Sequence, residues 1–130
     1  MHRTKYLSVA LLVVGLIFIL GIYPLTLIWP SGWTWHSGHS HYLPMILGIY
    51  ATLGSFLVVA SRNPLANLSL IWFTVWSSVV HGGIMAVQSL MNPDQIGHLW
   101  GDVLALFAVA GVLAALTPRK AAAELAQARA

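Results

Sequence analysis

The chain has 130 residues, of which 58% are hydrophobic and 7% are charged, against roughly 25% charged residues in soluble domains. This composition excludes an ordinary soluble domain and predicts a membrane protein. The six Lys and Arg residues give a net charge of +3, but they flank apolar runs instead of forming one basic face, so nucleic acid is not expected as a partner. The absence of cysteine excludes disulfides, thiolate metal ligands and iron–sulfur clusters.

Four apolar runs follow one another along the chain. They cover about residues 6–29, 43–60, 68–90 and 99–116. The first is longer than the roughly 7 to 15 apolar residues of a signal peptide and has no A-x-A site after it, so an uncleaved span is expected. Because lipid cannot satisfy exposed backbone groups, the runs are predicted to be helices.

Short connections between the runs predict an up-down-up-down arrangement. The sequence therefore predicts an all-α integral membrane protein, an antiparallel bundle of four transmembrane helices that forms a single membrane domain over residues 1–130. A polar, alanine-rich tail over residues 117–130 follows the last span.

The basic residues predict the orientation of the bundle. In a four-span chain all six Lys and Arg residues fall at one end, and the positive-inside rule makes that end cytoplasmic. Both termini are then cytoplasmic. The outer loops are "PSGWTWHSGHSH" and "MNPDQIGH". Four tryptophans are expected to form an aromatic belt at the outer interface: Trp29, Trp33, Trp35 and Trp100.

Histidines concentrate at this predicted outer end. The stretch "TWHSGHSHYLPM" carries His36, His39 and His41, and His98 is expected to begin the fourth span. Asp102 follows one turn further in, and His81 lies about 15 Å deep in the third span. Ionisable groups inside a membrane are costly, so they are candidates for a functional site that faces the bundle interior.

Helical spacing indicates a metal site. Three pairs four residues apart converge on the outer half: His41 with Met45, His81 with Met85, and His98 with Asp102. This is the spacing by which two side chains on one helix grip one ion. The predicted ligands are His39, His41, His81, His98 and Asp102, with Ser77 and Gln88 as the groups that orient them. Nitrogen and carboxylate ligands suit zinc or iron, and methionine sulfur would favour copper.

Other interpretations use the same residues. The loop histidines can be solvated, and the buried polar groups can simply bond helices together in an accessory subunit of a larger membrane complex or in a homo-oligomer. Alternatively, Gly82 and Gly83 beside His81 leave room for a flat macrocycle, which makes His81 a candidate axial ligand of haem or a chlorin. An open metal site could activate water or oxygen, but no residue pattern identifies a substrate or a catalytic group, so enzymatic activity stays open.

At "VVHGGIMAVQSL" and "GHLWGDVLAL" the chain resembles a family of small four-span bacterial inner-membrane proteins of uncharacterised function. The resemblance covers mainly the third and fourth spans. It implies a bacterial four-helix membrane bundle and brings no activity or functional residue with it.

Overall fold

The computed structural model describes residues 2–36 and 38–119, and the part of the chain that it describes is all helical. The elements in chain order are α1 (His2–Leu16), a π-helical segment η1 (Ile17–Gly21), α2 (Ile22–Ile28), α3 (Pro30–Trp33), α4 (Tyr42–Ala60), a 3₁₀ segment η2 (Pro64–Asn67), α5 (Leu68–Met91), a 3₁₀ segment η3 (Pro93–Trp100) and α6 (Asp102–Leu116).

Four helical stretches are long and apolar enough to cross a membrane: His2–Ile28, Tyr42–Ala60, Pro64–Met91 and Pro93–Leu116. The predicted fold is thus confirmed, and the chain is a multi-pass membrane protein. Large apolar side chains are exposed all along these helices, as expected where the surrounding solvent is lipid. The predicted tail falls mostly on residues 120–130, outside the described residues.

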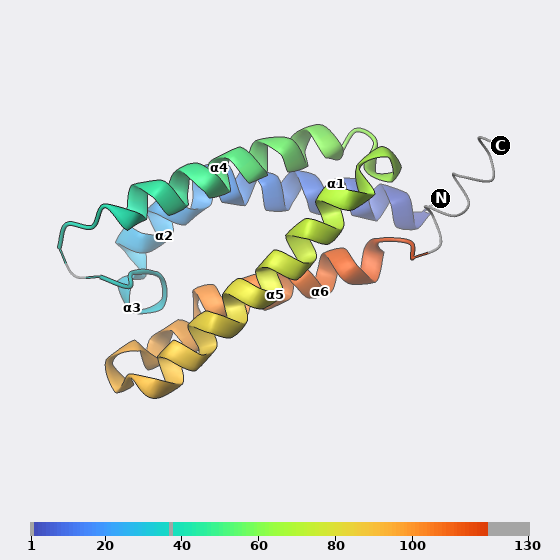
Figure 1. Cartoon of the computed structure of the whole chain (residues 1–130). Coiled ribbons are helices and arrows are strands. Elements are labelled where there is room, and N and C mark those ends of the chain that lie inside the picture. The colour runs from blue at the N-terminus through green and yellow to red at the C-terminus, as the bar shows by residue number, and fades with distance from the viewer. Residues whose placement is uncertain (1, 37, 120–130) are drawn as a thin grey trace.

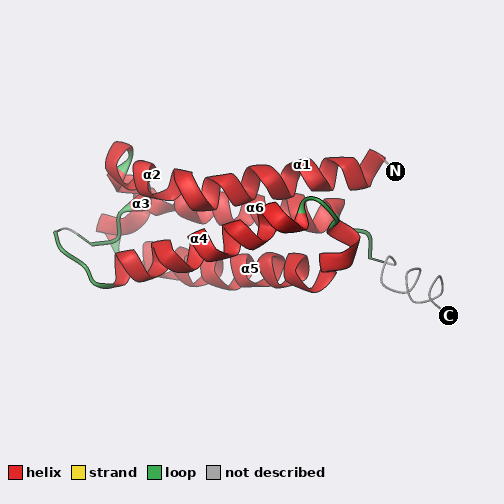
Figure 2. Ribbon diagram, turned by 90° about the horizontal axis from the view of Figure 1, so that it is seen from above, coloured by secondary structure: helices red, strands yellow, loops and turns green. Residues whose placement is uncertain are grey.

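The helices form two close pairs. α1 packs along α4, and α5 packs along α6 (Figure 1). The long helices run roughly along one axis (Figure 2). α4 and α5 meet near η2 and diverge toward the end that carries α3. We call that end the α3–η3 end. The opposite end, where α1 begins and α6 ends, is the basic end, because the described Lys and Arg residues lie there: Arg3, Lys5, Arg62 and Arg119.

Close helix contact explains the α1–α4 pair. A Cβ atom added at Gly15 would lie 2.7 Å from the carbonyl oxygen of Gly54, and one added at Gly54 would lie 2.5 Å from that of Gly15. Only glycine permits backbones to approach this closely, which is a common basis of helix association in membranes.

The first span contains a widened turn that the sequence analysis did not predict. Pro24 has no N–H and its ring would clash with the carbonyl of Leu20, four residues earlier. Leu20 lies in the π-helical segment η1, where the wider turn relieves that clash. The same segment carries Phe18, which is buried against α4.

The structure corrects the loop expected at "MNPDQIGH". Most of this segment belongs to the 3₁₀ helix η3 (Pro93–Trp100), and α6 begins only at Asp102. Asn92 and Pro93 do end α5 as predicted. However, Gly101 adopts φ −102° and ψ −110°, which breaks the helix that was expected to start at Leu99.

The apolar core lies toward the basic end. It consists of ten buried side chains from α1, η1, α4, α5 and α6: Leu7, Leu11, Val14, Phe18, Leu57, Ala60, Ile71, Val75, Ala110 and Leu113. A smaller cluster of Met85, Val103 and Leu106 lies toward the α3–η3 end. Polar side chains fill the remaining interior at that end, and they form the candidate site.

Candidate functional site

His98 and Asp102 form a buried pair where η3 meets α6. His98 is 1% exposed, and its Nδ1 lies 3.0 Å from Oδ1 of Asp102. Asp102 is the first residue of α6, where a carboxylate interacts favourably with the positive end of the helix dipole. The four-residue spacing does bring the two side chains together, but as a direct hydrogen bond between them, and the backbone between the two residues is not one continuous helix.

The loop after α3 completes this pair. Trp35 donates its indole N–H to Oδ2 of Asp102 at 2.6 Å, and its ring stacks on His98 with centroids 3.9 Å apart. Nε2 of His98 lies 3.1 Å from the backbone oxygen of Thr34. Because a carbonyl oxygen only accepts hydrogen bonds, Nε2 must carry a proton. Both ring nitrogens of His98 and both oxygens of Asp102 are thus engaged.

Small residues hold this loop against η3. A Cβ atom at Gly101 would lie 2.3 Å from the backbone oxygen of Gly32, and one at Gly97 would lie 2.7 Å from that of Ser31. This close approach docks α3 on η3. Trp35 was expected in the outer aromatic belt, but it is half-buried and inserted into the bundle, because the docked α3 directs the following residues inward.

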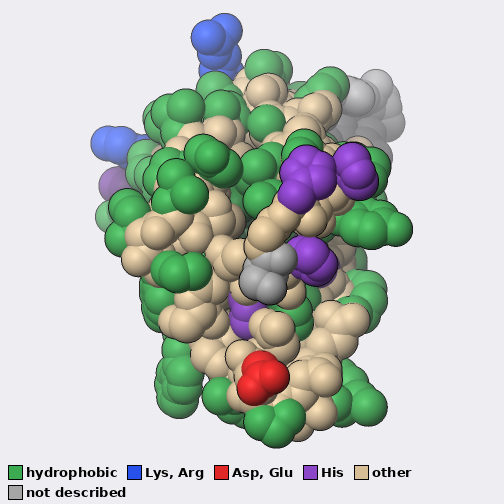
Figure 3. Space-filling model, turned by 90° about the vertical axis from the view of Figure 1, so that its left-hand side faces the viewer, with side chains coloured by type: hydrophobic (Ala, Val, Ile, Leu, Met, Phe, Trp, Pro, Cys, Tyr) green, Lys and Arg blue, Asp and Glu red, His purple; other side chains and the backbone are tan. Residues whose placement is uncertain are grey.

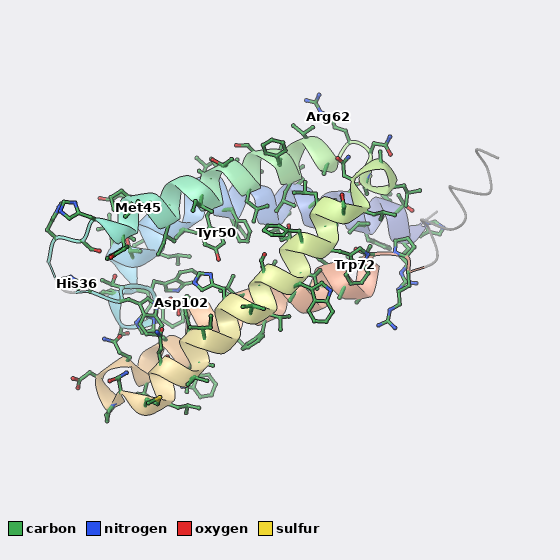
Figure 4. The ribbon with its side chains drawn as sticks, viewed as in Figure 1. His36, Met45, Tyr50, Arg62, Trp72 and Asp102 are labelled. Carbon is green, nitrogen blue, oxygen red and sulfur yellow. The ribbon has the colours of Figure 1, made fainter. Side chains whose placement is uncertain are left out.

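A second polar pair bridges α4 and α5. The hydroxyl of Tyr50 and Nδ1 of His81 share a hydrogen bond of 2.5 Å, and the two rings are stacked with centroids 5.8 Å apart. Phe18 packs edge-on against Tyr50 at 5.0 Å. Tyr50 points from α4 into the space between the diverging helices, on the side where Asp102 lies (Figure 4).

A polar pocket opens at the α3–η3 end. It has a volume of about 360 Å³ and is lined by five side chains: Trp35, Gln88, Asn92, Asp94 and Gln95. Trp35 forms a wall of the pocket and also donates a hydrogen bond to Asp102, so it separates the pocket from the buried pair. Figure 3 views this end and shows histidine and acidic side chains on it, while Lys and Arg side chains appear only at its edge.

The predicted metal ligands fall into three separate groups. His39 and His41 lie exposed on the loop with ring centroids 4.7 Å apart. His81 pairs with Tyr50, and His98 pairs with Asp102. Among residues 2–36 and 38–119, no three His, Asp or Glu side chains are arranged to hold one metal ion. The shared five-ligand site therefore stays a prediction without geometric support.

The two predicted orienting residues do not bond to these groups. Ser77 donates to the backbone oxygen of Thr74 at 3.2 Å, and Gln88 is exposed at the polar pocket. Elsewhere on α5, Thr74, Ser78 and Met85 face inward, since they are at most 7% exposed.

The macrocycle interpretation depends on space beside His81. A Cβ atom at Gly82 would lie 3.4 Å from side-chain atoms of Leu106 and Phe107, so α6 already covers that glycine. Gly83 has open space around it. The space beside Gly82 is therefore filled by α6 and the space beside Gly83 is open, and binding of a macrocycle stays a prediction.

Comparison with known proteins identifies a family. A model for a family of unknown function (DUF6632) matches residues 2–129. The chain belongs to this family. No match was found among curated proteins or among solved structures. The matched range covers nearly the whole chain and includes both polar pairs and the pocket. The match agrees with the resemblance to an uncharacterised family that was noted in the third and fourth spans.

Sequence reasoning missed Tyr50 and Thr34 altogether and assigned Trp35 another role. Tyr50 is surrounded by apolar residues and carries no charge, so nothing in its neighbourhood marks it. The one available signal was its position: Tyr50 lies nine residues into α4, too deep for a residue of the interfacial belt, and a buried tyrosine hydroxyl usually has a hydrogen-bond partner.

Proposed function

We propose that this protein binds a small organic cation in the polar pocket at the α3–η3 end. The observation that carries the proposal is the double role of Trp35. Its indole lines a pocket of about 360 Å³ and is fixed from behind by Asp102 and His98. A site held by locked side chains binds with less loss of conformational entropy than a flexible one.

Charge supports a cationic ligand. Asp94 is the one acidic residue among those that line the pocket, and the described Lys and Arg residues belong to segments at the basic end. The face of an indole attracts a cation, and the amides of Gln88 and Gln95 offer acceptor oxygens. A carboxylate, an aromatic face and amide oxygens together suit an ammonium group.

A fluorescence titration tests this proposal. Protein in lipid nanodiscs is titrated with tetramethylammonium and, separately, with its neutral isostere tert-butyl alcohol. The signal is the part of the tryptophan emission that Trp35→Phe removes. We expect the cation alone to bind. Asp94→Asn should weaken binding by about fivefold, the upper value for an exposed charge pair.

Asn67 provides a matched control for a substitution at Asn92. Asn92 lines the pocket and donates to the backbone oxygen of Gln88 at 2.9 Å, and Asn67 makes the same bond to Asn63 at 2.9 Å near the basic end. Asn92→Leu should reduce binding, and Asn67→Leu should not. Equal binding of the neutral isostere, or equal loss in both variants, would refute the proposed site.

The pocket is proposed to face the outside of a bacterial inner membrane, with both termini in the cytoplasm. The support is the positive-inside rule applied to the basic end. Because the chain has no cysteine, single substitutions can be labelled cleanly. A membrane-impermeant maleimide should label Asp94→Cys in intact cells, and it should label Arg62→Cys only after permeabilisation. The reverse pattern would invert the orientation.

Transition-metal binding is a second candidate, centred on His39 and His41. Their imidazole rings lie 4.7 Å apart and perpendicular, so two nitrogens can approach one zinc or copper ion whose other positions hold water. Elemental analysis of purified protein tests it. Metal should be lost when both histidines are replaced by alanine and retained in His36→Ala, which changes the same loop. Retention in the double variant would refute it.

A further inference from the structure

The hydrogen bonds around His98 fix how many protons the pair of His98 and Asp102 holds. Nε2 donates to the backbone oxygen of Thr34 at 3.1 Å, because a carbonyl oxygen only accepts. Nδ1 lies 3.0 Å from Oδ1 of Asp102, so a second proton lies between these two atoms. Oδ2 accepts from the indole N–H of Trp35 and needs no proton of its own. The pair therefore holds two protons and has no net charge.

Loss of one of these protons breaks one of the two contacts of His98. If the remaining proton stays on Nε2, a bare Nδ1 faces the carboxylate of Asp102. If the remaining proton moves to Nδ1, a bare Nε2 faces the carbonyl of Thr34. The second arrangement costs less, because an unpaired buried charge is more costly than an unpaired neutral nitrogen. His98 is 1% exposed, so water does not replace the lost partner.

The contact that is lost joins two distant segments. Thr34 belongs to the loop after α3 and His98 to η3, 64 positions further along the chain. Thr34 also donates its hydroxyl to the backbone oxygen of Thr26 in α2 at 2.9 Å, and neither of those two groups titrates. Deprotonation of the pair therefore separates the loop from η3 and leaves the loop attached to α2.

We propose that the proton shared by His98 and Asp102 acts as a pH-sensitive latch: the protonated pair holds the loop after α3 on η3, and the pair releases the loop as the pH rises. The two residues titrate as one unit, because each holds the proton that the other needs. Trp35 transmits the release to the polar pocket, since its indole lines that pocket. The latch does not depend on what the pocket binds.

Other titratable groups lie on the elements that pack around this pair. Among the described residues they are Tyr23 on α2, His36 on the loop, Tyr50 on α4, His81 on α5 and Asp94 on η3. α1 also packs on α6, but its titratable side chains belong to its first turns at the basic end. Only histidine ordinarily changes charge between about pH 5 and 8, so His36 and His81 are the groups that could imitate the latch.

Hydrogen–deuterium exchange followed by mass spectrometry tests the latch. The full chain in lipid nanodiscs is labelled at about pH 6 and at about pH 9, on either side of the transition expected for a histidine. Protection factors, from which the intrinsic effect of pH on exchange is divided out, are compared for residues 30–36 and for residues 61–67 at the basic end. Protection of residues 30–36 should fall about tenfold at the higher pH, the effect of one lost buried hydrogen bond. Protection of residues 61–67 should not change.

Asp102→Asn separates the shared proton from a purely structural role of this side chain. The amide has the shape of the carboxyl group, its N–H can donate to Nδ1 of a neutral His98, and its oxygen can accept from Trp35. Nε2 then keeps its bond to Thr34 with no shared proton to lose. Residues 30–36 of this variant should stay protected at about pH 9.

His36→Ala and His81→Ala leave the pair in place, and both should keep the response of the wild type. Protection of residues 61–67 checks that each variant is folded. Equal protection of residues 30–36 at the two pH values in the wild type, or the same loss in Asp102→Asn, would overturn the inference. Loss of the response in His36→Ala or in His81→Ala would also overturn it, because a different histidine would then be the titrating group.

Discussion

The hydrogen bond between Trp35 and Asp102 can be tested by Trp35→Phe, which removes the indole N–H and keeps an aromatic ring against His98. The bond is 2.6 Å long and partly buried. Hydrogen bonds to ionisable groups contribute about 1.5–3 kcal/mol in soluble proteins. Polar pairs between membrane helices average about 0.6 kcal/mol and reach about 1.7 kcal/mol. Because this bond is short and shielded, we expect a value near the upper membrane limit, about 1.5 kcal/mol.

A double-mutant cycle measures this value. The free energy of unfolding is determined for the wild type, Trp35→Phe, Asp102→Leu and the double variant, in mixed micelles titrated with a denaturing detergent and followed by far-UV circular dichroism. Asp102→Leu also breaks the bond to His98, but that loss occurs on both sides of the cycle and cancels. The coupling free energy should be about 1.5 kcal/mol.

Trp76 supplies the control, because its indole is 61% exposed on the lipid-facing side of α5. A cycle of Trp76→Phe with Asp102→Leu should give a coupling within about 0.5 kcal/mol of zero. If the Trp35 cycle gives a coupling no larger than the Trp76 cycle, the indole does not stabilise the buried carboxyl group, and the account of Trp35 as the fixed wall of the pocket fails.

Two further substitutions test the helix contacts. Tyr50→Phe removes the hydroxyl bonded to His81 and keeps the ring, so the free energy of unfolding should fall by about 1 kcal/mol; an unchanged value would mean that this hydrogen bond is not made. Gly54→Ala forces α4 away from the backbone of Gly15 and should destabilise by about 2 kcal/mol, measured by the same detergent titration. Gly48→Ala, on the open face of the same helix, should change stability by less than about 0.5 kcal/mol, and equal losses in the two alanine variants would contradict the close α1–α4 crossing.

The fold could be predicted because its signals are local. Runs of apolar residues identify spans, and the Asn-Pro pairs at 63–64 and 92–93 mark their ends. The proximity of His98 and Asp102 was also predictable from their four-residue spacing, although the direct hydrogen bond between them was not predicted. These features need no knowledge of how the spans pack on one another.

The rest of the site depends on tertiary contacts. Trp35 reaches Asp102 across 67 positions of sequence, and it does so because Gly32 docks against Gly101. A glycine in a loop can equally mark a turn, so its role as a contact surface is not visible in the sequence. Likewise, the sequence does not show whether a tryptophan next to a predicted membrane interface points outward, as a belt residue does, or inward toward the bundle.

Histidines that stabilise the fold differ from histidines that can bind a metal in whether their ring nitrogens already have hydrogen-bond partners. A metal ion could reach His98 only by displacing its bond to Asp102 or to Thr34, and a buried polar group left unpaired costs about 1–3 kcal/mol. His39 and His41 are exposed, so they can turn toward an ion at little cost. Stability and metal binding should therefore respond to different histidines.

We expect His98→Ala to lower the free energy of unfolding by about 2 kcal/mol and to leave bound zinc or copper unchanged in calorimetric titration. The paired replacement of His39 and His41 by alanine should do the opposite: metal binding is lost, and stability changes by less than about 0.5 kcal/mol. Loss of metal in His98→Ala with unchanged stability would show that His98 is a ligand, and the hydrogen bonds assigned to it would then not describe its role.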